Sequence, residues 1–311
     1  MTRAADRLRP AWDTARGTGV ASPCAHRTAH PAARTPDANP HRRGDPPSPW
    51  RPHPLIARFP ITNRCGRHLM AAEHALIGLS PWNGYFTARR VESLVEWAAG
   101  TFRTVDVFVP SYEAAYTLIA AGVEPSVAVG RARRAVKKLR GPAQRALLRA
   151  GCGEGRVHTG TSLAALPRYR QLRRTAERMY HHDPGVRAAC RAVARAAVAG
   201  ALGVRDRGPS QPVPDPDLSE GALDTAARYA WAELPVMLDS PGIFGVGSSV
   251  LVYHRRIPLI ESLLEDGSAL SPSPGQGFVV VAPGWSSADG VAKEVQGGPY
   301  RVPPGREAAA L

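Results

Sequence analysis

Short apolar runs alternate with longer helix-forming segments over most of the chain, from about residue 58 to residue 283. Several of the short runs are apolar at consecutive positions, which is typical of strands buried on both faces of a parallel sheet. The longer segments carry apolar residues three or four positions apart and predict helices. This alternation predicts an α/β fold with a doubly wound parallel sheet, because strand–helix–strand units place helices on both faces of a sheet. The expected strands are 74–80, 105–109, 156–159, 249–254 and 277–281, and the expected helices are 89–99, 112–121, 126–140, 169–181, 185–199, 220–236 and 257–265.

The two ends of the chain differ from this middle part in composition. Residues 1–57 are rich in Arg, Pro, Ala and His and have no sustained apolar period, so we expect a disordered basic leader. No apolar core of a secretory signal follows its first arginines, while a transit peptide or a later start of translation, such as Met70, stays open. We expect one folded domain over residues 58–283 and a flexible tail over residues 284–311.

Basic residues exceed acidic ones, 40 to 26, and give a formal net charge of +14. The excess is not confined to the leader, because residues 126–150 contain eight Lys and Arg and no Asp or Glu. Like charges three or four positions apart on a helix repel each other, so we expect a polyanion, most commonly a phosphodiester backbone, to bind there. A solvated helix face is the alternative. Gly141-Pro142 predicts that this helix ends at residue 140, which leaves Arg145 and Arg149 pointing elsewhere.

The sequence carries no motif for a nucleotide or a metal. Cys24, Cys65, Cys152 and Cys190 are scattered without a C-x-x-C spacing, so neither a disulfide framework nor zinc is indicated. The first expected strand is followed by no G-x-G-x-x-G pattern, and the chain contains no Walker sequence. We therefore expect no ATP, no dinucleotide and no metal. The longest apolar runs, such as FVVVA, are too short to span a membrane, and we expect a cytoplasmic monomer without an obligate protein partner.

The first expected strand ends on Ser80 and then breaks on Pro-Trp-Asn-Gly. In α/β sheets, ligands bind beyond the carboxyl ends of the strands, near the point where the strand order reverses, so we expect the Ser80 hydroxyl to face a ligand crevice. A serine that merely suits a turn is the alternative. The stretch Gly78-Leu79-Ser80-Pro81-Trp82 lacks the second glycine of a nucleophile elbow, which weakens the hypothesis of a serine esterase.

Two later segments place titratable side chains where they can meet Ser80. Tyr229 and Glu233 lie four residues apart on an expected helix, so a phenol and a carboxylate share one face and can hold an ammonium group. Tyr253 and His254 end an expected strand at the same edge of the sheet as Ser80. The alternatives are a helix-edge tyrosine with a solvated glutamate, and a half-buried tyrosine bonded to the backbone.

Taken together, these segments resemble the cyclodipeptide synthases over about residues 62–283. The resemblance is carried, in order along the chain, by HALIGLSPWNGYF, VDVFVP, LIAAG followed by RARRAVKKLR, YAWAE, DSPGIFGVGSSVLVYH and QGFVVVAP. It implies a Rossmann-like catalytic domain similar to that of the class I tyrosyl- and tryptophanyl-tRNA synthetases. It also implies that the protein makes 2,5-diketopiperazines from two aminoacyl-tRNAs, which are then its partners.

The resemblance also implies a role for individual residues. Ser80 is the nucleophile that takes the first aminoacyl group, Tyr229 and Glu233 hold the α-ammonium group, and Tyr253 relays a proton during ring closure. Asn83 positions the substrate, and Asn83, Tyr253 and His254 match a subgroup marked by Asn, Tyr and His. The tRNA contacts are expected at Arg131, Arg133, Arg134, Lys137, Lys138 and Arg140.

Apolar residues are expected around the first aminoacyl side chain. Gly78 lines that pocket in the resemblance, and its apolar neighbours are expected to be Leu76, Phe108, Val236 and Leu251, with Trp82 nearby. His74 is expected to be a packing or capping residue. An aminoacyl ester is already activated, which accounts for the missing nucleotide motif. The choice between leucine, phenylalanine, tyrosine and tryptophan stays open, and a non-catalytic tRNA- or RNA-binding Rossmann module is the alternative function.

Overall fold

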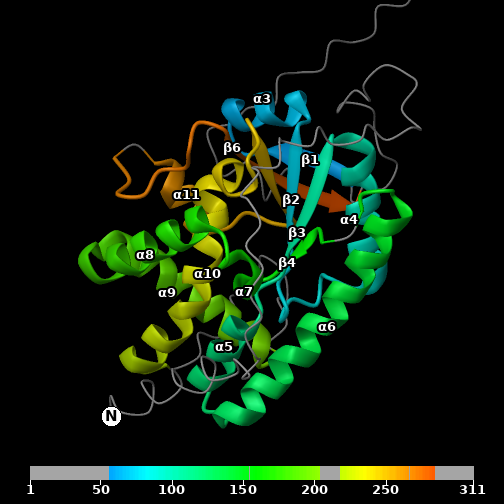
Figure 1. Cartoon of the computed structure of the whole chain (residues 1–311). Coiled ribbons are helices and arrows are strands. Elements are labelled where there is room, and N and C mark those ends of the chain that lie inside the picture. Colours follow the sequence, from blue (N-terminus) through cyan, green and yellow to red (C-terminus); the bar gives the residue numbers. More distant parts are fainter. Residues whose placement is uncertain (1–55, 154, 204–217, 266, 284–311) are drawn as a thin grey trace, which may run out of the picture. The chain divides into compact units, whose positions relative to one another are not determined.

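The computed structural model describes residues 56–153, 155–203, 218–265 and 267–283. The expected leader lies outside the described residues except for its last two, and the expected tail over 284–311 lies wholly outside them. The described residues form a six-stranded sheet with helices on both faces (Figure 1). Its strands are β1 (Ile56–Pro60), β2 (His74–Gly78), β3 (Thr104–Phe108), β4 (Val157–His158), β5 (Ser249–Tyr253) and β6 (Gln276–Pro283).

The strand order is β1-β6-β5-β2-β3-β4. Strand β2 pairs in parallel with β3 on one side and with β5 on the other, so the strand order reverses between β2 and β5. The predicted doubly wound sheet and all five predicted strands are confirmed, with small shifts at their ends. One strand, β1, was not predicted, and it pairs antiparallel with β6 at the edge of the otherwise parallel sheet. The five residues of this edge strand, IARFP, show neither an alternation of apolar and polar residues nor a continuous apolar run, so the sequence does not indicate a strand here.

The helices are α3 (Asn63–Ala71), α4 (Ala88–Thr101), η1 (Tyr112–Ala114), α5 (Ala115–Ala120), α6 (Pro125–Arg149), α7 (Gly160–Leu163), α8 (Pro167–His182), α9 (Pro184–Ala201), α10 (Glu220–Phe244) and α11 (Pro258–Leu264). The seven predicted helices are present, whereas α3 and α7 were not predicted. None of the described helices is long and apolar enough to cross a membrane.

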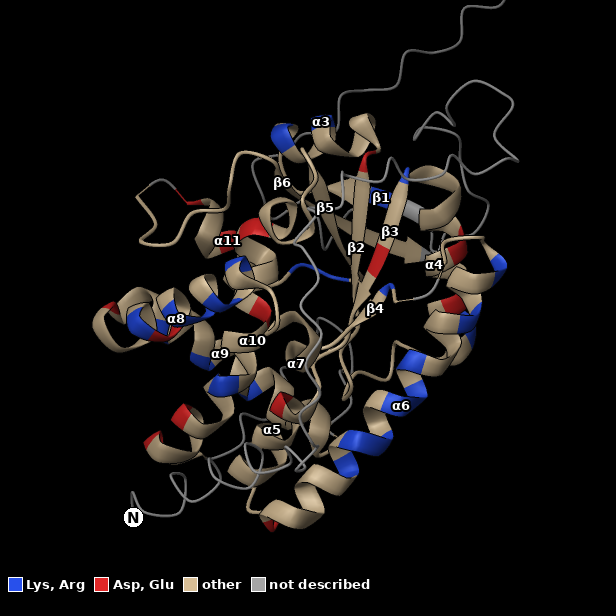
Figure 2. Ribbon diagram, viewed as in Figure 1, with Lys and Arg blue, Asp and Glu red and all other residues tan. Residues whose placement is uncertain are grey.

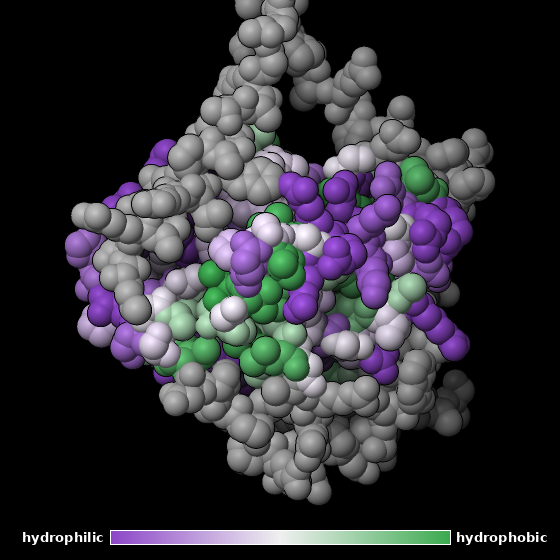
Figure 3. All heavy atoms as spheres, turned by 90° about the horizontal axis from the view of Figure 1, so that it is seen from below, coloured by the Kyte–Doolittle hydropathy of each residue, from purple (hydrophilic) through white to green (hydrophobic). Residues whose placement is uncertain are grey.

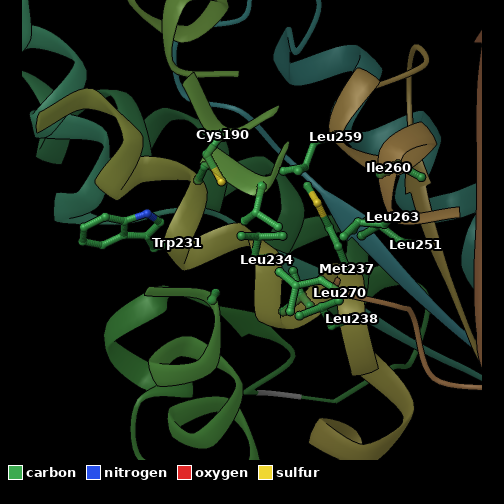
Figure 4. Close-up of a cluster of buried hydrophobic side chains, with 14 of the residues drawn as sticks. Cys190, Trp231, Leu234, Met237, Leu238, Leu251, Leu259, Ile260, Leu263 and Leu270 are labelled. Atoms are coloured by element: carbon green, nitrogen blue, oxygen red, sulfur yellow. The ribbon is translucent and has the colours of Figure 1, made fainter. Parts of the chain in front are cut away.

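Alternate residues of the central strands pack into two different cores. Leu76 and Leu251 lie with residues of α8, α9, α10 and α11 on one face of the sheet. Ala75, Ile77 and Val252 lie with residues of α4 and α6 on the other face. This two-residue period follows from the pleat of a β-strand, whose successive side chains point to opposite faces. Figure 4 shows part of the first core, in which α10 contributes Trp231, Leu234, Met237 and Leu238.

Helix α10 is longer than predicted and changes direction at Asp239. Two helical segments meet there, because Asp239 has non-helical backbone angles of φ −158° and ψ 60°. Its carboxylate accepts the backbone N–H of Gly242 at 3.1 Å and forms an ion pair with Arg168 of α8 at 2.7 Å. A Cβ atom on Gly242 would overlap that carboxylate, so a larger residue here would displace Asp239 from its present position. This arrangement ties the kink of α10 to the first turn of α8.

The prediction that the basic helix ends at residue 140 is wrong. Helix α6 continues through Gly141 and Pro142 to Arg149. Proline inside a helix costs about 3 kcal/mol, because it removes one hydrogen bond and crowds the preceding turn. The apolar side of the second half offsets this cost, since Leu139, Ala143, Ala146 and Leu147 are buried against the sheet and α4.

Candidate active site

Ser80 lies two residues beyond the end of β2, at the point where the strand order reverses. The N–H of Leu79 still bonds to the carbonyl of Phe108, and a turn begins at Ser80, whose carbonyl accepts the N–H of Asn83 at 3.2 Å. The backbone therefore presents the serine side chain at the carboxyl edge of the sheet. Its Oγ lies 2.7 Å from the hydroxyl oxygen of Tyr229, and either hydroxyl can donate this hydrogen bond.

Tyr229 and Glu233 lie one turn apart on α10, as the spacing predicts. Tyr229 is only 2% exposed, and burial together with the nearby Glu233 carboxylate raises the pKa of its phenol well above the ordinary value. Burial also raises the pKa of Glu233 to about 7, although a hydrogen bond from Tyr229 acts in the opposite direction. The carboxyl group of Glu233 can therefore gain or lose a proton near neutral pH.

Tyr253 ends β5 next to the same edge. A Cβ atom on Gly78 would lie 3.5 Å from the Tyr253 ring and 3.8 Å from Leu251, so the end of β2 lies directly against the end of β5. Burial and the Glu233 carboxylate raise the pKa of Tyr253, while hydrogen bonding with the side chains of Ser80 and Asn83 opposes that rise. The structure thus brings Ser80, Tyr229, Glu233 and Tyr253 together, as the sequence predicts.

Asn83 and His254 form a second pair at this edge. The amide nitrogen of Asn83 lies 2.6 Å from Nε2 of His254, and the amide oxygen accepts the N–H of Tyr85 at 2.9 Å. Burial lowers the pKa of His254 to about 3, so the ring is neutral and accepts at Nε2. The Tyr85 ring stacks on His254 at 4.3 Å, and Phe86 meets it edge-on at 5.2 Å. These two aromatic residues were not predicted, although they follow Asn83 directly in the sequence.

The apolar residues predicted for the first pocket belong to one cluster. Leu76, Phe108, Val236 and Leu251 are all buried in the core on the α10 face of the sheet. Trp82 lies elsewhere, because it packs against the small cluster that contains Tyr229 and donates from Nε1 to the carbonyl of Ala114 at 3.0 Å. Trp82 therefore supports the loop that follows Ser80.

The predicted polyanion-binding residues are exposed on α6. Figure 2 shows lysines and arginines along the outer side of this helix. Arg145 and Arg149 turn toward α4 and form ion pairs with Glu92 at 3.3 and 3.6 Å. The exposed residues that remain are Arg131, Arg133, Arg134, Lys137, Lys138 and Arg140.

Seen from below, hydrophobic residues gather beside a hydrophilic region of the surface (Figure 3). The exposed apolar side chains of the chain's described part include Val127, near the start of α6, and Leu202, which caps α9.

A buried ion pair near the site was also missed from the sequence. Glu113 is fully buried just beyond β3, and Arg173 of α8 lies 3.4 Å from its carboxylate. The pKa of Arg173 is raised, because the neighbouring Tyr169 and Glu113 outweigh the effect of burial. A Cβ atom on Gly160 would overlap the Glu113 carboxylate, so a larger residue there would displace Glu113 from its present position. A charged residue directly after a buried strand, in VPSYEA, was the signal available.

A serine–histidine–aspartate group lies inside the sheet, apart from Ser80. His74 contacts Ser249 Oγ at 2.7 Å through Nδ1 and Asp106 at 3.1 Å through Nε2, while His158 and Arg156 also bond to Asp106. Ser249, His74 and Asp106 are each no more than 3% exposed, so no substrate reaches them. His74 is a packing residue, as predicted, and the group fastens β2, β3, β4 and β5 to one another.

The residues around Ser80 offer hydroxyl groups, one carboxyl group and amide and imidazole nitrogens. Over the described ranges, no group of three or more His, Cys, Asp and Glu is placed to hold a metal ion. The arrangement can attack an activated carbonyl through Ser80 and hold an ammonium group between Tyr229 and Glu233. The absence of a metal and of ATP from the reaction stays a prediction.

Known proteins resemble the chain over the same residues. A family model described as cyclodipeptide synthase matches residues 56–283. The cyclo(L-leucyl-L-leucyl) synthase of Bacillus subtilis is 31% identical over 221 residues, which cover 71% of this chain and 87% of that protein. The cyclo(L-leucyl-L-phenylalanyl) synthase of Streptomyces noursei is 32% identical over 213 residues, covering 68% of this chain and 85% of the relative.

A solved structure agrees with the fold. A cyclodipeptide synthetase of Mycobacterium tuberculosis, whose structure relates these enzymes to type I tRNA synthetases, matches with a TM-score of 0.60 and 28% identity. The match covers 73% of this chain and 93% of that one. The Rossmann-like α/β fold predicted from the sequence is therefore confirmed.

Proposed function

The chain belongs to the cyclodipeptide synthase family, and we propose that it joins two aminoacyl groups, delivered by two aminoacyl-tRNAs, through an ester on Ser80. The observation that carries this proposal is the 2.7 Å contact between Ser80 Oγ and the Tyr229 hydroxyl, one helical turn from Glu233. A nucleophile, Ser80, and a binding site for a free amine, formed by Tyr229 and Glu233, thus lie at one edge of the sheet. An aminoacyl-tRNA carries both groups that such an edge recognises, an activated ester and an α-ammonium.

In the first step, Ser80 Oγ attacks the carbonyl carbon of the aminoacyl ester. The new Oγ–C bond forms as the bond from that carbon to the ribose oxygen breaks, and the serine proton ends on the departing ribose hydroxyl. Ester is exchanged for ester, so the step needs no ATP. The Tyr229 hydroxyl supports proton transfer, because it lies within hydrogen-bond distance of Oγ.

In the second step, the α-amine of the Ser80 ester attacks the second aminoacyl-tRNA. The amine has to lose its proton before it attacks, and a carboxyl group with a pKa of about 7 is suited to accept it. Glu233 therefore first holds the ammonium group and then takes its proton. A peptide bond forms, the second tRNA leaves, and a dipeptidyl ester remains on Ser80.

In the third step, the new terminal amine attacks the carbonyl carbon of the Ser80 ester. The C–N bond closes a six-membered ring, and Oγ leaves and regains a proton. Tyr253 relays this proton, since its ring lies against Gly78 at the end of β2, two residues before Ser80. Holding the amine and the ester on one protein contributes several kcal/mol, about 7 or more in well-aligned systems.

Neighbouring contacts support the finer assignments. The Asn83–His254 contact, together with Tyr253 beside it, supports membership of the subgroup marked by Asn, Tyr and His. The exposed basic side of α6 is the surface for tRNA. The buried apolar side chains of Leu76, Phe108, Val236 and Leu251 favour an apolar first amino acid, in keeping with the leucyl and phenylalanyl products named for two relatives.

The test is to trap the ester. Purified protein is mixed with aminoacyl-tRNA labelled in the amino acid, and the label on protein is measured after denaturation, with mass spectrometry of cyclic dipeptides in parallel. We expect label on Ser80 of the wild-type protein, none on Ser80→Ala, and product only from the wild type. Tight tRNA binding without label or product would instead identify a non-catalytic tRNA-binding module, and turnover of a simple ester without tRNA would identify an esterase.

A further inference from the structure

Helix α8 carries a second set of arginines that the proposed reaction has not used. It contains five arginines and one acidic residue, Glu177. Two of the arginines form ion pairs with buried carboxylates, Arg168 with Asp239 at 2.7 Å and Arg173 with Glu113 at 3.4 Å. The other three are exposed and form what we name the α8 stripe: Arg170, Arg174 and Arg178.

The spacing of the α8 stripe places its three charges on one side of the helix. Residues four apart lie one above the other, about 6 Å apart along the axis. The Arg170 guanidinium donates to the carbonyls of Ala164 and Ala165, and Arg178 donates to the Thr175 hydroxyl. Within the described part of the chain, no carboxylate lies at ion-pair distance from any of the three. Like charges four apart are destabilising, so this row indicates an external anion.

Helix α8 also begins next to the reacting groups. The hydroxyl of Tyr169, in its first turn, donates to the carbonyl of Ala232 at 2.9 Å, and Ala232 directly precedes Glu233. In Figure 2, α8 and the basic α6 lie on opposite sides of the strand ends. The two basic helices are therefore separate surfaces that flank the same site.

The order of the reaction assigns a different target to each aminoacyl-tRNA. The first ester has to meet the Ser80 oxygen, whereas the second has to meet the amine of the group already bound to Ser80. That amine is held by Glu233, whose neighbour Ala232 contacts α8. The backbone of α10 next to Glu233 therefore borders the first turn of α8.

We propose that the α8 stripe binds the phosphate backbone of the second aminoacyl-tRNA, while α6 binds the first. This inference rests on the proposed function, because only a reaction that consumes two charged tRNAs in sequence has use for two such surfaces. Arginine suits the task, since its guanidinium stays charged and matches phosphate geometry.

The test separates the two transfer steps. Arg174→Glu is compared with Arg67→Glu, which makes the same charge change on an exposed residue of α3, and with Arg174→Lys, which keeps the charge. The first readout is the rate at which label appears on Ser80. The second is the rate at which the isolated aminoacyl-enzyme is consumed by a second aminoacyl-tRNA, measured against its concentration and against salt.

We expect Arg174→Glu to form the Ser80 ester within twofold of the wild-type rate and to raise the apparent KM of the second step by about 10-fold. The slope of log(1/KM) of the second step against log salt concentration is expected to fall in magnitude by about 1, as for one lost phosphate contact. Arg67→Glu and Arg174→Lys stay close to wild type. If the second step of Arg174→Glu kept the wild-type kinetics, or if its first step were slowed as much as its second, the proposal for α8 would be wrong. The proposed function would not be affected by either result. A wild-type protein that forms no ester overturns the proposed function, and this inference with it.

Discussion

The side-chain amide of Asn83 lies 2.6 Å from Nε2 of His254, which fastens the loop after β2 to the end of β5. Because burial lowers the pKa of His254 to about 3, its ring stays neutral and depends on this amide as its donor. The contact joins two segments that meet only because β2 and β5 are neighbours in the sheet. It holds the turn that carries Ser80 against the strand that carries Tyr253.

Replacing Asn83 with Ala removes this donor and leaves a buried ring nitrogen unpaired. Such a loss costs about 1–3 kcal/mol, so we expect the melting temperature of Asn83→Ala to fall by several degrees. Thermal unfolding followed by circular dichroism measures it, with Asn63→Ala, at an exposed position on α3, as the control. Equal melting temperatures for the two variants would show that the contact does not stabilise the fold.

Replacing Ser80 with Ala removes the nucleophile. We expect cyclic dipeptide formation to fall at least about 10³-fold, because removal of a catalytic serine has effects of this size or larger. Tyr229→Phe keeps the ring but loses the hydroxyl 2.7 Å from Oγ, and we expect a loss of about 10²-fold. Mass spectrometry of the products measures both variants. Ser271→Ala, at an exposed position, serves as the control, and product from Ser80→Ala at the control's rate would refute the assignment.

The rate of the reaction is expected to rise with pH around pH 7. Burial raises the pKa of Glu233 to about 7, so below that pH the group is neutral and neither attracts an ammonium nor accepts its proton. We expect kcat/KM to increase as the pH rises through 7. This rise is expected to be absent in Glu233→Gln, which is also slower than the wild type. The profile is measured from pH 5.5 to pH 8.5, with Glu96→Gln on the surface as the control. If kcat/KM of Glu233→Gln rose over the same pH range as in the wild type, the titrating group would not be Glu233.

Asp106 is expected to stabilise the sheet through its charge. Burial alone would raise its pKa, but hydrogen bonds from His158 and His74 hold the pKa well below its usual range. The unfolded carboxyl group binds a proton more readily, so this stabilisation is present above about pH 4 and is lost as the pH falls below it. Asp106→Asn leaves Arg156 without a counter-charge and weakens the hydrogen bonds to both histidines, and we expect a loss of about 3–5 kcal/mol. Urea unfolding at pH 7 measures it against the exposed control Glu265→Gln; equal midpoints would contradict the assignment.

Helix α6 is expected to bind tRNA through its charge. We expect Arg134→Glu to weaken binding of deacylated tRNA and to reduce the slope of log K against log salt concentration by about 1. Arg67→Glu changes the net charge equally at a position outside this helix, and Arg134→Lys keeps the charge. Fluorescence anisotropy with labelled tRNA measures all three. If Arg67→Glu weakened binding as strongly as Arg134→Glu, net charge and not this surface would account for the affinity.

Most of the sheet could be predicted because its strands have local signatures. The apolar segments that became β2, β3, β5 and β6 are bounded by turn residues, and the carboxyl ends of β2 and β5 follow from their direction. That direction is enough to place Ser80 near Tyr253, and the spacing of Tyr229 and Glu233 on one helix is local as well. The predicted site residues came together for this reason.

The features that were missed depend on tertiary contacts. Strand β1 exists because β6 offers it an open edge, and α6 continues past Pro142 because α4 supports its apolar side. Nothing near Glu113 in the sequence reveals its partner Arg173, which lies 60 positions away on α8. Local sequence patterns carry no information about such distant partners. The exact lengths of helices and strands and the buried ion pairs could therefore not be predicted from the sequence.

The alternation of side chains along β2 and β5 places two groups of residues on opposite faces of the sheet, where substitutions are expected to have different effects. Leu76 and Leu251 point toward α10, where the first amino acid is proposed to lie, whereas Ile77, Val250 and Val252 hold the scaffold on the opposite side. Under the proposed function, we expect exchanges in the first group to change the product, while the second group keeps the protein folded. New products would then require only a few substitutions, all on one face of two neighbouring strands.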